Sequence, residues 1–190
     1  MWNVEYKECL DSGFRISQAQ SHMTITSSAR RVARLLKSTG LKVVFAESCT
    51  GGLVCGSLTK VPGISEHHCG GMVVYRNETK AAYLEIPRKL LNDPGPVSRP
   101  VAELMARRVL DRTPEADLSA AVTGHLGPNA PANLDGLVFV AIAVRNPATI
   151  AIHELHCRPR DSRVVRQRWV VERALELLAD ALAGQIESRS

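Results

Sequence analysis

The sequence has few aromatic residues, no cysteine pair spaced C-x-x-C and no long apolar run. Aromatic residues make up 4% of the 190 residues, so Val, Leu, Ala and Ile must fill any core. No apolar stretch approaches the roughly 18 residues that a membrane-spanning helix needs, which excludes a transmembrane helix. The cysteines number 5, and no secretory apolar segment opens the chain. We therefore expect reduced thiols rather than a disulfide framework, no membrane partner and a cytoplasmic location.

The composition is typical of one globular domain. Apolar residues account for 45% and charged residues for 23%, close to the average for folded proteins. The 24 basic and 19 acidic residues leave a net charge of +5, which suits an anionic small substrate as readily as nucleic acid. Residues 1–22 are polar and irregular and are predicted to form an N-terminal extension, followed by one domain over residues 23–190.

Strand and helix patterns alternate along this domain. Strands are expected at 42–46, 69–75, 118–123, 137–144 and 149–157. Helices are expected from a cap at Thr26 or Ser27 to Gly40, over 53–60, after caps at Asn77 and Ser98, and over 162–186. The inward stripe of the last helix is predicted to be Val164, Val171, Leu175, Leu178 and Leu182. Because the late strands can pair as a hairpin, we predict an α/β fold, a three-layer α/β/α sandwich around a mixed sheet.

Ser48 stands where a buried strand gives way to a Gly-Gly turn and a helix. Ligand sites of open α/β sheets lie beyond the carboxyl ends of their strands. The backbone N–H groups that open the next helix can hold an anion or a developing oxyanion. The serine could equally be a simple helix cap. Neither a G-x-S-x-G elbow nor a phosphate-binding Walker loop surrounds it.

A serine nucleophile needs a proton acceptor, and two residues further along the chain are candidates. Tyr75 ends a strand and Lys80 lies early in the following helix, so both could stand at the same sheet edge as Ser48. A lysine acts as a base only when burial or nearby positive charge lowers its pKa, and the tyrosine hydroxyl could relay the proton. Alternatively, Tyr75 is a core aromatic and Lys80 a solvated helix residue. The Y-x4-K spacing and the missing dinucleotide fingerprint argue against a short-chain dehydrogenase.

Three blocks of sequence resemble the CinA C-terminal domain family: AESCTGG at 46–52, VPGIS at 61–65 and GMVVYRNETK at 71–80. The resemblance covers roughly residues 26–182. It implies a homo-oligomeric enzyme that deamidates nicotinamide mononucleotide, a pyridine nucleotide, to nicotinate mononucleotide, with neither metal nor cofactor. It also implies a serine nucleophile with a tyrosine and a lysine, which map onto Ser48, Tyr75 and Lys80. The positions expected to bind the oxyanion or the substrate are Cys49, Thr50, Gly51, Gly52, Asn77, Thr123 and Gly124.

The loop at 124–136 departs from the family's pattern. Asn129-Ala130-Pro131 replaces paired glycines, and His125 stands where a small or apolar residue is usual. Because glycines let backbone approach a ligand closely, we expect the change to affect the substrate more than the nucleophile. Arg76, in place of a small residue, could bind a phosphate or disfavour a protonated Lys80. The alternative is therefore a catalytically weak nucleotide-binding or interaction protein on the same fold.

The other residues that could take part in catalysis or bind a ligand are mostly expected to have structural roles. Cys49 would need a histidine base to act as the nucleophile, and none lies near it in sequence, so we expect a structural thiol. The His/Cys clusters at 67–69 and 153–157 lack the spacing of an established zinc motif, and no metal is expected. The arginine cluster over 158–173 is expected to be a solvated face, with one arginine near a substrate phosphate, rather than a nucleic-acid surface.

Overall fold

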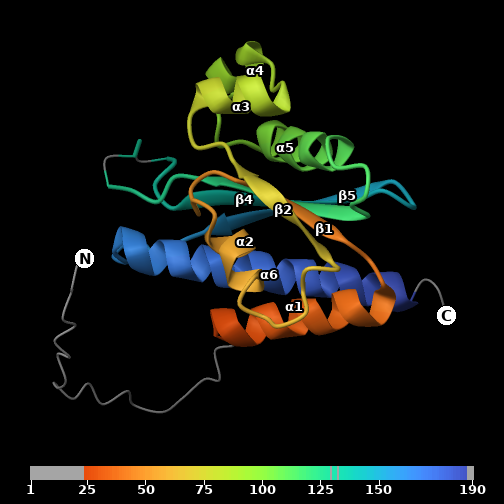
Figure 1. Ribbon diagram of the computed structural model, residues 1–190. Coiled ribbons are helices and arrows are strands. Elements are labelled where there is room, and N and C mark those ends of the chain that lie inside the picture. Colours follow the sequence, from red (N-terminus) through yellow and green to blue (C-terminus); the bar gives the residue numbers. More distant parts are fainter. Residues whose placement is uncertain (1–23, 129, 132, 188–190) are drawn as a thin grey trace, which may run out of the picture.

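The computed structural model describes residues 24–128, 130–131 and 133–187, so the predicted extension at 1–22 lies outside the described residues. Its centre is a sheet of five strands in the order β2-β1-β3-β4-β5 (Figure 1). β1 runs parallel to β2 and β3, whereas β4 and β5 are antiparallel to their neighbours, which confirms the predicted mixed sheet. The strands are β1 Val43–Glu47, β2 His68–Val73, β3 Leu118–Gly124, β4 Leu137–Val144 and β5 Thr149–His156.

Helices cover both faces of the sheet, as the predicted three-layer sandwich requires (Figure 1). α1 (Ile25–Thr39), α2 (Leu53–Leu58) and α6 (Arg163–Glu187) lie on one face. α3 (Asn77–Leu84), α4 (Arg88–Asn92) and α5 (Arg99–Asp111) lie on the other. Side chains alternate between the two cores along β1: Phe45 packs in the α1/α6 core and Ala46 in the α5 core. β1 is consequently buried along its whole length, and its carboxyl end is held rigidly.

Three details of the helices differ from the sequence-based expectation. α1 is capped by Thr24, whose Oγ1 accepts the Ser27 N–H at 3.2 Å, and not by Thr26 or Ser27, which lie inside its first turn. α3 is capped by Arg76 rather than Asn77. The short helix α4 was not anticipated, because five residues are too few to show a helical period.

The inward stripe of α6 is also corrected at one position. Val171, Leu175, Leu178 and Leu182 are fully buried as predicted, but Val164 is 56% exposed. Arg166 takes the inward place in the first turn, because it lies in the same row as Val170 at a spacing of four residues, and it is itself buried. The amino end of α6 therefore turns polar groups, rather than apolar ones, toward the carboxyl edge of the sheet.

Candidate active site

Ser48 directly follows β1, and its neighbour Glu47 shapes the turn. The Ser48 N–H donates to the Val122 carbonyl at 2.9 Å, which continues the pairing of β1 with β3. The buried Glu47 carboxylate accepts three backbone N–H groups that open α2, from Gly52 (3.0 Å), Val54 (3.1 Å) and Cys55 (2.7 Å). Because one carboxylate satisfies these donors, the turn has a fixed shape. We did not single out Glu47 from the sequence, although a carboxylate on a buried strand beside a Gly-Gly turn was a usable signal.

Positive backbone φ angles close this turn. Gly51 (φ +65°) and Gly52 (φ +93°) take left-handed conformations that favour glycine. The Gly51 N–H donates to the Ser48 carbonyl at 3.1 Å, and the Gly52 N–H is held by Glu47. The N–H groups of Cys49 and Thr50 donate to no oxygen in the described part of the chain. Of the four residues from Cys49 to Gly52 that were predicted to bind an oxyanion, only Cys49 and Thr50 therefore have a backbone N–H group that is not already used in this way.

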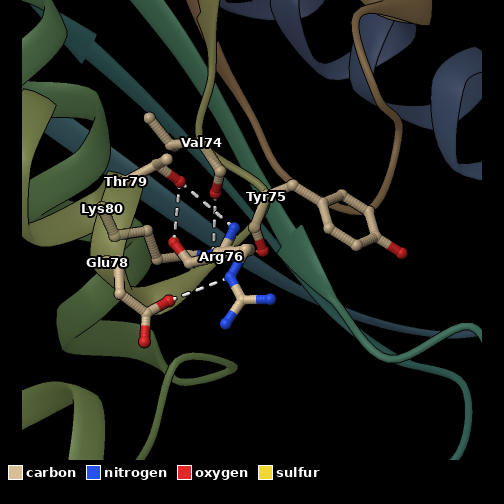
Figure 2. A network of polar contacts seen from close by, with 6 residues as sticks. All are labelled: Val74, Tyr75, Arg76, Glu78, Thr79 and Lys80. Carbon is tan, nitrogen blue, oxygen red and sulfur yellow. Dashed lines mark hydrogen bonds and ion pairs between the residues drawn. The ribbon is translucent and has the colours of Figure 1, made fainter.

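Lys80 lies against Ser48 in a buried position. Its side chain is brought in by the first turn of α3, and the residue is only 2% exposed. Nζ lies 3.0 Å from Ser48 Oγ. It also lies 2.9 Å from the Val74 carbonyl oxygen and 3.4 Å from that of Tyr75, two residues that Figure 2 draws beside Lys80. Burial lowers the pKa of Lys80 to about 8, because the charged form is poorly solvated there. The alternative of a solvated Lys80 is wrong, and the amine has the position and the pKa of a base.

Tyr75 contributes to this site through two different groups. Its carbonyl oxygen contacts the Lys80 amine, but its ring points away from that amine (Figure 2). The phenol oxygen accepts a hydrogen bond from Arg163 Nη2 at 2.8 Å, and the residue is 57% exposed, so it is not a core aromatic. Because Nζ of Lys80 contacts Ser48 Oγ directly, the pair needs no relay through the Tyr75 hydroxyl.

A cavity of about 190 Å³ opens over Ser48 and Lys80. Of the predicted binding residues, Cys49, Asn77, Thr123 and Gly124 line it with Tyr75, whereas Thr50, Gly51 and Gly52 do not. The remaining lining residues are Pro96, Val97, His125, Leu126, Gly127, Pro128, Ala130 and Arg163. His125 thus faces the cavity, and Arg163 is a lining residue that the sequence argument did not name individually.

Contacts within the protein explain why a threonine stands at position 123 and a glycine at position 124. The Thr123 hydroxyl donates to the Pro96 carbonyl at 2.8 Å and so ties β3 to the loop before α5. A Cβ on Gly124 would come within 2.6 Å of Val138 Cγ2, so a side chain there would push β4 away. Both residues line the cavity, and these contacts fix the shape of its wall.

Cys49 is a poor nucleophile in this environment. The residue is buried, and burial raises the pKa of its thiol to about 12, which disfavours the thiolate. Its carbonyl oxygen instead accepts a hydrogen bond from Gln167 Nε2 at 3.1 Å, which anchors the turn to α6. Cys49 therefore supplies a wall and a backbone N–H, in keeping with the expected structural thiol.

The arginine cluster of α6 is not one solvated face. Arg166 is buried and forms a two-pronged ion pair with Asp135, at 2.6 and 2.9 Å, that holds the 124–136 loop against the helix. Arg163 donates to the Gly127 carbonyl at 2.6 Å and lines the cavity, whereas Arg168 is exposed.

The described residues contain no group of three or more His, Cys, Asp or Glu side chains placed to hold a metal ion. None of the described helices has the length and apolarity to cross a bilayer.

Comparison with known proteins gives a consistent result. The family model of the CinA C-terminal domain matches residues 25–182. A CinA-like protein of Geobacter metallireducens is 44% identical over 114 residues, which are 59% of this chain and 27% of that protein. A putative competence-damage inducible protein of Symbiobacterium thermophilum is 45% identical over 116 residues, 60% of this chain and again 27% of the relative. The chain thus matches about a quarter of the length of these curated relatives.

Solved structures match a larger share of this chain, and nearly the full length of the matched chains. The competence/damage inducible protein CihA of Agrobacterium tumefaciens superposes with a TM-score of 0.79 at 36% identity, covering 88% of this chain and 99% of that one. A competence-damaged protein superfamily member from Klebsiella pneumoniae superposes with a TM-score of 0.78 at 25% identity, covering 84% and 98%. These structures share the mixed sheet and the helices on its two faces.

Proposed function

The chain belongs to the CinA C-terminal domain family, and from that premise we propose that it hydrolyses the carboxamide of a pyridine nucleotide. The proposed reaction converts nicotinamide mononucleotide and water to nicotinate mononucleotide and ammonia. The observation that carries this proposal is the 3.0 Å contact between Lys80 Nζ and Ser48 Oγ, in a buried corner beneath a cavity. In the proposed reaction the Ser48 hydroxyl is the nucleophile, and Lys80, whose pKa is lowered, is the base that accepts its proton.

The mechanism follows from these contacts. Neutral Lys80 takes the Ser48 proton as Oγ attacks the carboxamide carbon, and the N–H group of Cys49, which lines the cavity, stabilises the oxyanion by about 3 kcal/mol. The C–N bond then breaks, and the Lys80 ammonium gives its proton to the leaving nitrogen, which departs as ammonia. Water attacks the acyl-Ser48 carbonyl and passes a proton to Lys80. Collapse releases the carboxylic acid and restores the serine.

The altered loop supports a second candidate, a nucleotide-binding protein with little or no turnover. His125 and Ala130 line the cavity directly, so the changes from the family's glycine-rich pattern reach the space where a substrate would lie. They leave the Ser48–Lys80 contact itself in place. Turnover, rather than nucleotide binding, therefore separates the two candidates.

The experiment compares ammonia release from nicotinamide mononucleotide by the purified protein and by Ser48→Ala. We expect the variant to lose at least about a thousandfold in kcat, because no other hydroxyl of the described residues hydrogen-bonds to Lys80 Nζ. Ser57→Ala is the matched control: this serine lies on α2, donates to the Leu53 carbonyl and does not line the cavity, and its loss should leave kcat unchanged. Full turnover by Ser48→Ala would exclude the mechanism, and nucleotide binding without turnover by the wild type would favour the second candidate.

A further inference from the structure

The cavity over Ser48 has an unbalanced charge. Among the described residues its lining contains no aspartate and no glutamate, but it contains Lys80 and Arg163. Lys80 can lose its proton near neutral pH, whereas a guanidinium stays charged at any pH at which the protein is folded. A positive charge that no acid in the wall offsets favours a ligand that carries negative charge.

Arg163 differs from its neighbours on α6 in having only neutral partners. Arg166, one turn further on, is paired with Asp135, and Arg173 is paired with Glu176. Arg163 donates instead to the Gly127 carbonyl and to the Tyr75 phenol oxygen, and it forms no ion pair within the described ranges. Two of its N–H groups are used in this way, which orients the guanidinium and leaves other N–H groups for a ligand.

The Tyr75 hydroxyl is oriented by the same contact. Because its oxygen accepts a hydrogen bond from Arg163 Nη2, its own proton is available to a further acceptor. The two residues come from distant parts of the chain, Tyr75 from the connection between β2 and α3 and Arg163 from the start of α6. Both line the cavity, so a guanidinium N–H and a phenol O–H lie side by side on its wall.

We propose that Arg163, with the Tyr75 hydroxyl beside it, binds the phosphoryl group of the nucleotide substrate. The assignment rests on the proposed function and deepens it. Arginine suits this role because its planar N–H groups match phosphate oxygens, and a tyrosine O–H adds a neutral donor. Arg76, which the sequence also offered for a phosphate, does not line the cavity; its side chain is 76% exposed and paired with Glu78. Arg163 and Tyr75 thereby make the site select a phosphorylated amide over the same amide without phosphate.

The test compares two substrates with the same carboxamide, nicotinamide mononucleotide and nicotinamide riboside, which lacks the phosphate. Arg163→Met should raise KM for the mononucleotide by about 10–100-fold with kcat within a few fold, and leave the riboside kinetics nearly unchanged. Tyr75→Phe should lower the preference for the mononucleotide by a few fold, because one donor is lost. Arg163→Lys keeps the charge and should retain part of the preference. Arg76→Met is the matched control and should behave as the wild type.

Each outcome decides the assignment. An undiminished preference for the mononucleotide in Arg163→Met overturns it, as does an equal loss for both substrates, which would mean that Arg163 acts only by holding Gly127. If the wild type releases no ammonia from either compound, the proposed function fails, and calorimetric binding of the two compounds tests the assignment by itself. The wild type should then bind the mononucleotide at least about tenfold more tightly than the riboside, and Arg163→Met should lose that difference.

Discussion

Lys80 shows how burial changes the protonation of a side chain that is ordinarily a surface cation. Its amine is surrounded by the Ser48 hydroxyl and two carbonyl oxygens, which can hydrogen-bond to it but carry no charge. Burial therefore outweighs the favourable contacts and lowers its pKa. The carbonyl oxygens of Val74 and Tyr75 hold Nζ beside Ser48 Oγ, so the local backbone sets the geometry of the amine while burial sets the direction of its pKa shift.

The pH dependence of catalysis follows from this pKa. In the proposed mechanism the neutral amine is the active form, and burial lowers the pKa of Lys80 to about 8. We therefore expect kcat/KM to rise by about tenfold per pH unit below that value and to level off above it. The measurement is kcat/KM for nicotinamide mononucleotide between about pH 6.5 and 9.5. A profile that is flat, or that falls as the pH rises through 8, would show that Lys80 is not the base.

The same pKa predicts a pH dependence of stability. Below pH 8 both folded and unfolded chains hold the Lys80 proton; between about 8 and 10.5 only the unfolded chain does, so stability rises with pH in that window. Relative to Lys80→Met, the wild type should gain roughly 3 kcal/mol in free energy of unfolding between pH 7.5 and 10.5. Urea unfolding of both proteins at the two pH values measures this gain in the free energy of unfolding. An equal response in the two proteins would contradict the buried-amine account.

At the scale of elements, the site depends on the turn from β1 into α2. Glu47 belongs to the strand, yet its carboxylate accepts the N–H groups that begin the helix, so strand and helix are joined by one side chain. Gln167 on α6 holds the other side of the turn through the Cys49 carbonyl. With these groups engaged, the N–H groups of Cys49 and Thr50 donate to no oxygen among the described residues, and Cys49 lines the cavity.

Glu47→Gln should therefore disturb the turn. One of the two oxygens becomes an NH₂ group that meets a backbone N–H, so at least one donor is left unsatisfied in a buried place. We expect a loss of about 2–4 kcal/mol in free energy of unfolding, together with a large fall in kcat. Urea titration measures the stability. The control is Glu103→Gln, whose exposed pair with Arg107 on α5 should change stability by less than about 0.5 kcal/mol. Equal effects of the two substitutions would refute the role of Glu47.

The elements themselves were largely predictable, because they depend on local pattern. The β1 run Val43–Glu47, the hairpin β4–β5 and the Ser98 cap of α5 all agree with the sequence-based expectation. Ser48 and Lys80 were both candidates for the site. Tyr75 was also a candidate for the site, but nothing in its local sequence shows that its hydroxyl contacts Arg163, 88 positions away.

At the scale of the whole molecule, the site is assembled from segments far apart in sequence. Lys80 reaches Ser48 across 32 positions, and Gln167 reaches Cys49 across 118. Such pairs depend on the order of the strands and on the angle at which α6 crosses the sheet, neither of which a local period encodes. For the same reason Arg166 was assigned to a solvated cluster, whereas tertiary packing buries it against Asp135.

The Arg166–Asp135 pair joins the 124–136 loop to α6, and its removal should loosen the far wall of the cavity. A Cβ on Gly127 would approach Asp135 Oδ1 to 2.9 Å, so the loop backbone lies directly on the pair. Arg166→Met should lower the midpoint of thermal unfolding by several degrees and raise KM, because the Gly127 segment loses its support. Arg168→Met, an exposed neighbour on the same helix, should change neither quantity. If both variants unfold at the wild-type temperature, the pair is not a structural link.

The most direct test of the account is mass spectrometry of the protein quenched during turnover of nicotinamide mononucleotide. The Ser48–Lys80 pair predicts an acyl group on the peptide that contains Ser48, absent from Ser48→Ala, which should also release no ammonia above background. An acyl group on Cys49 in place of Ser48, or ammonia release by Ser48→Ala at the wild-type rate, would contradict it.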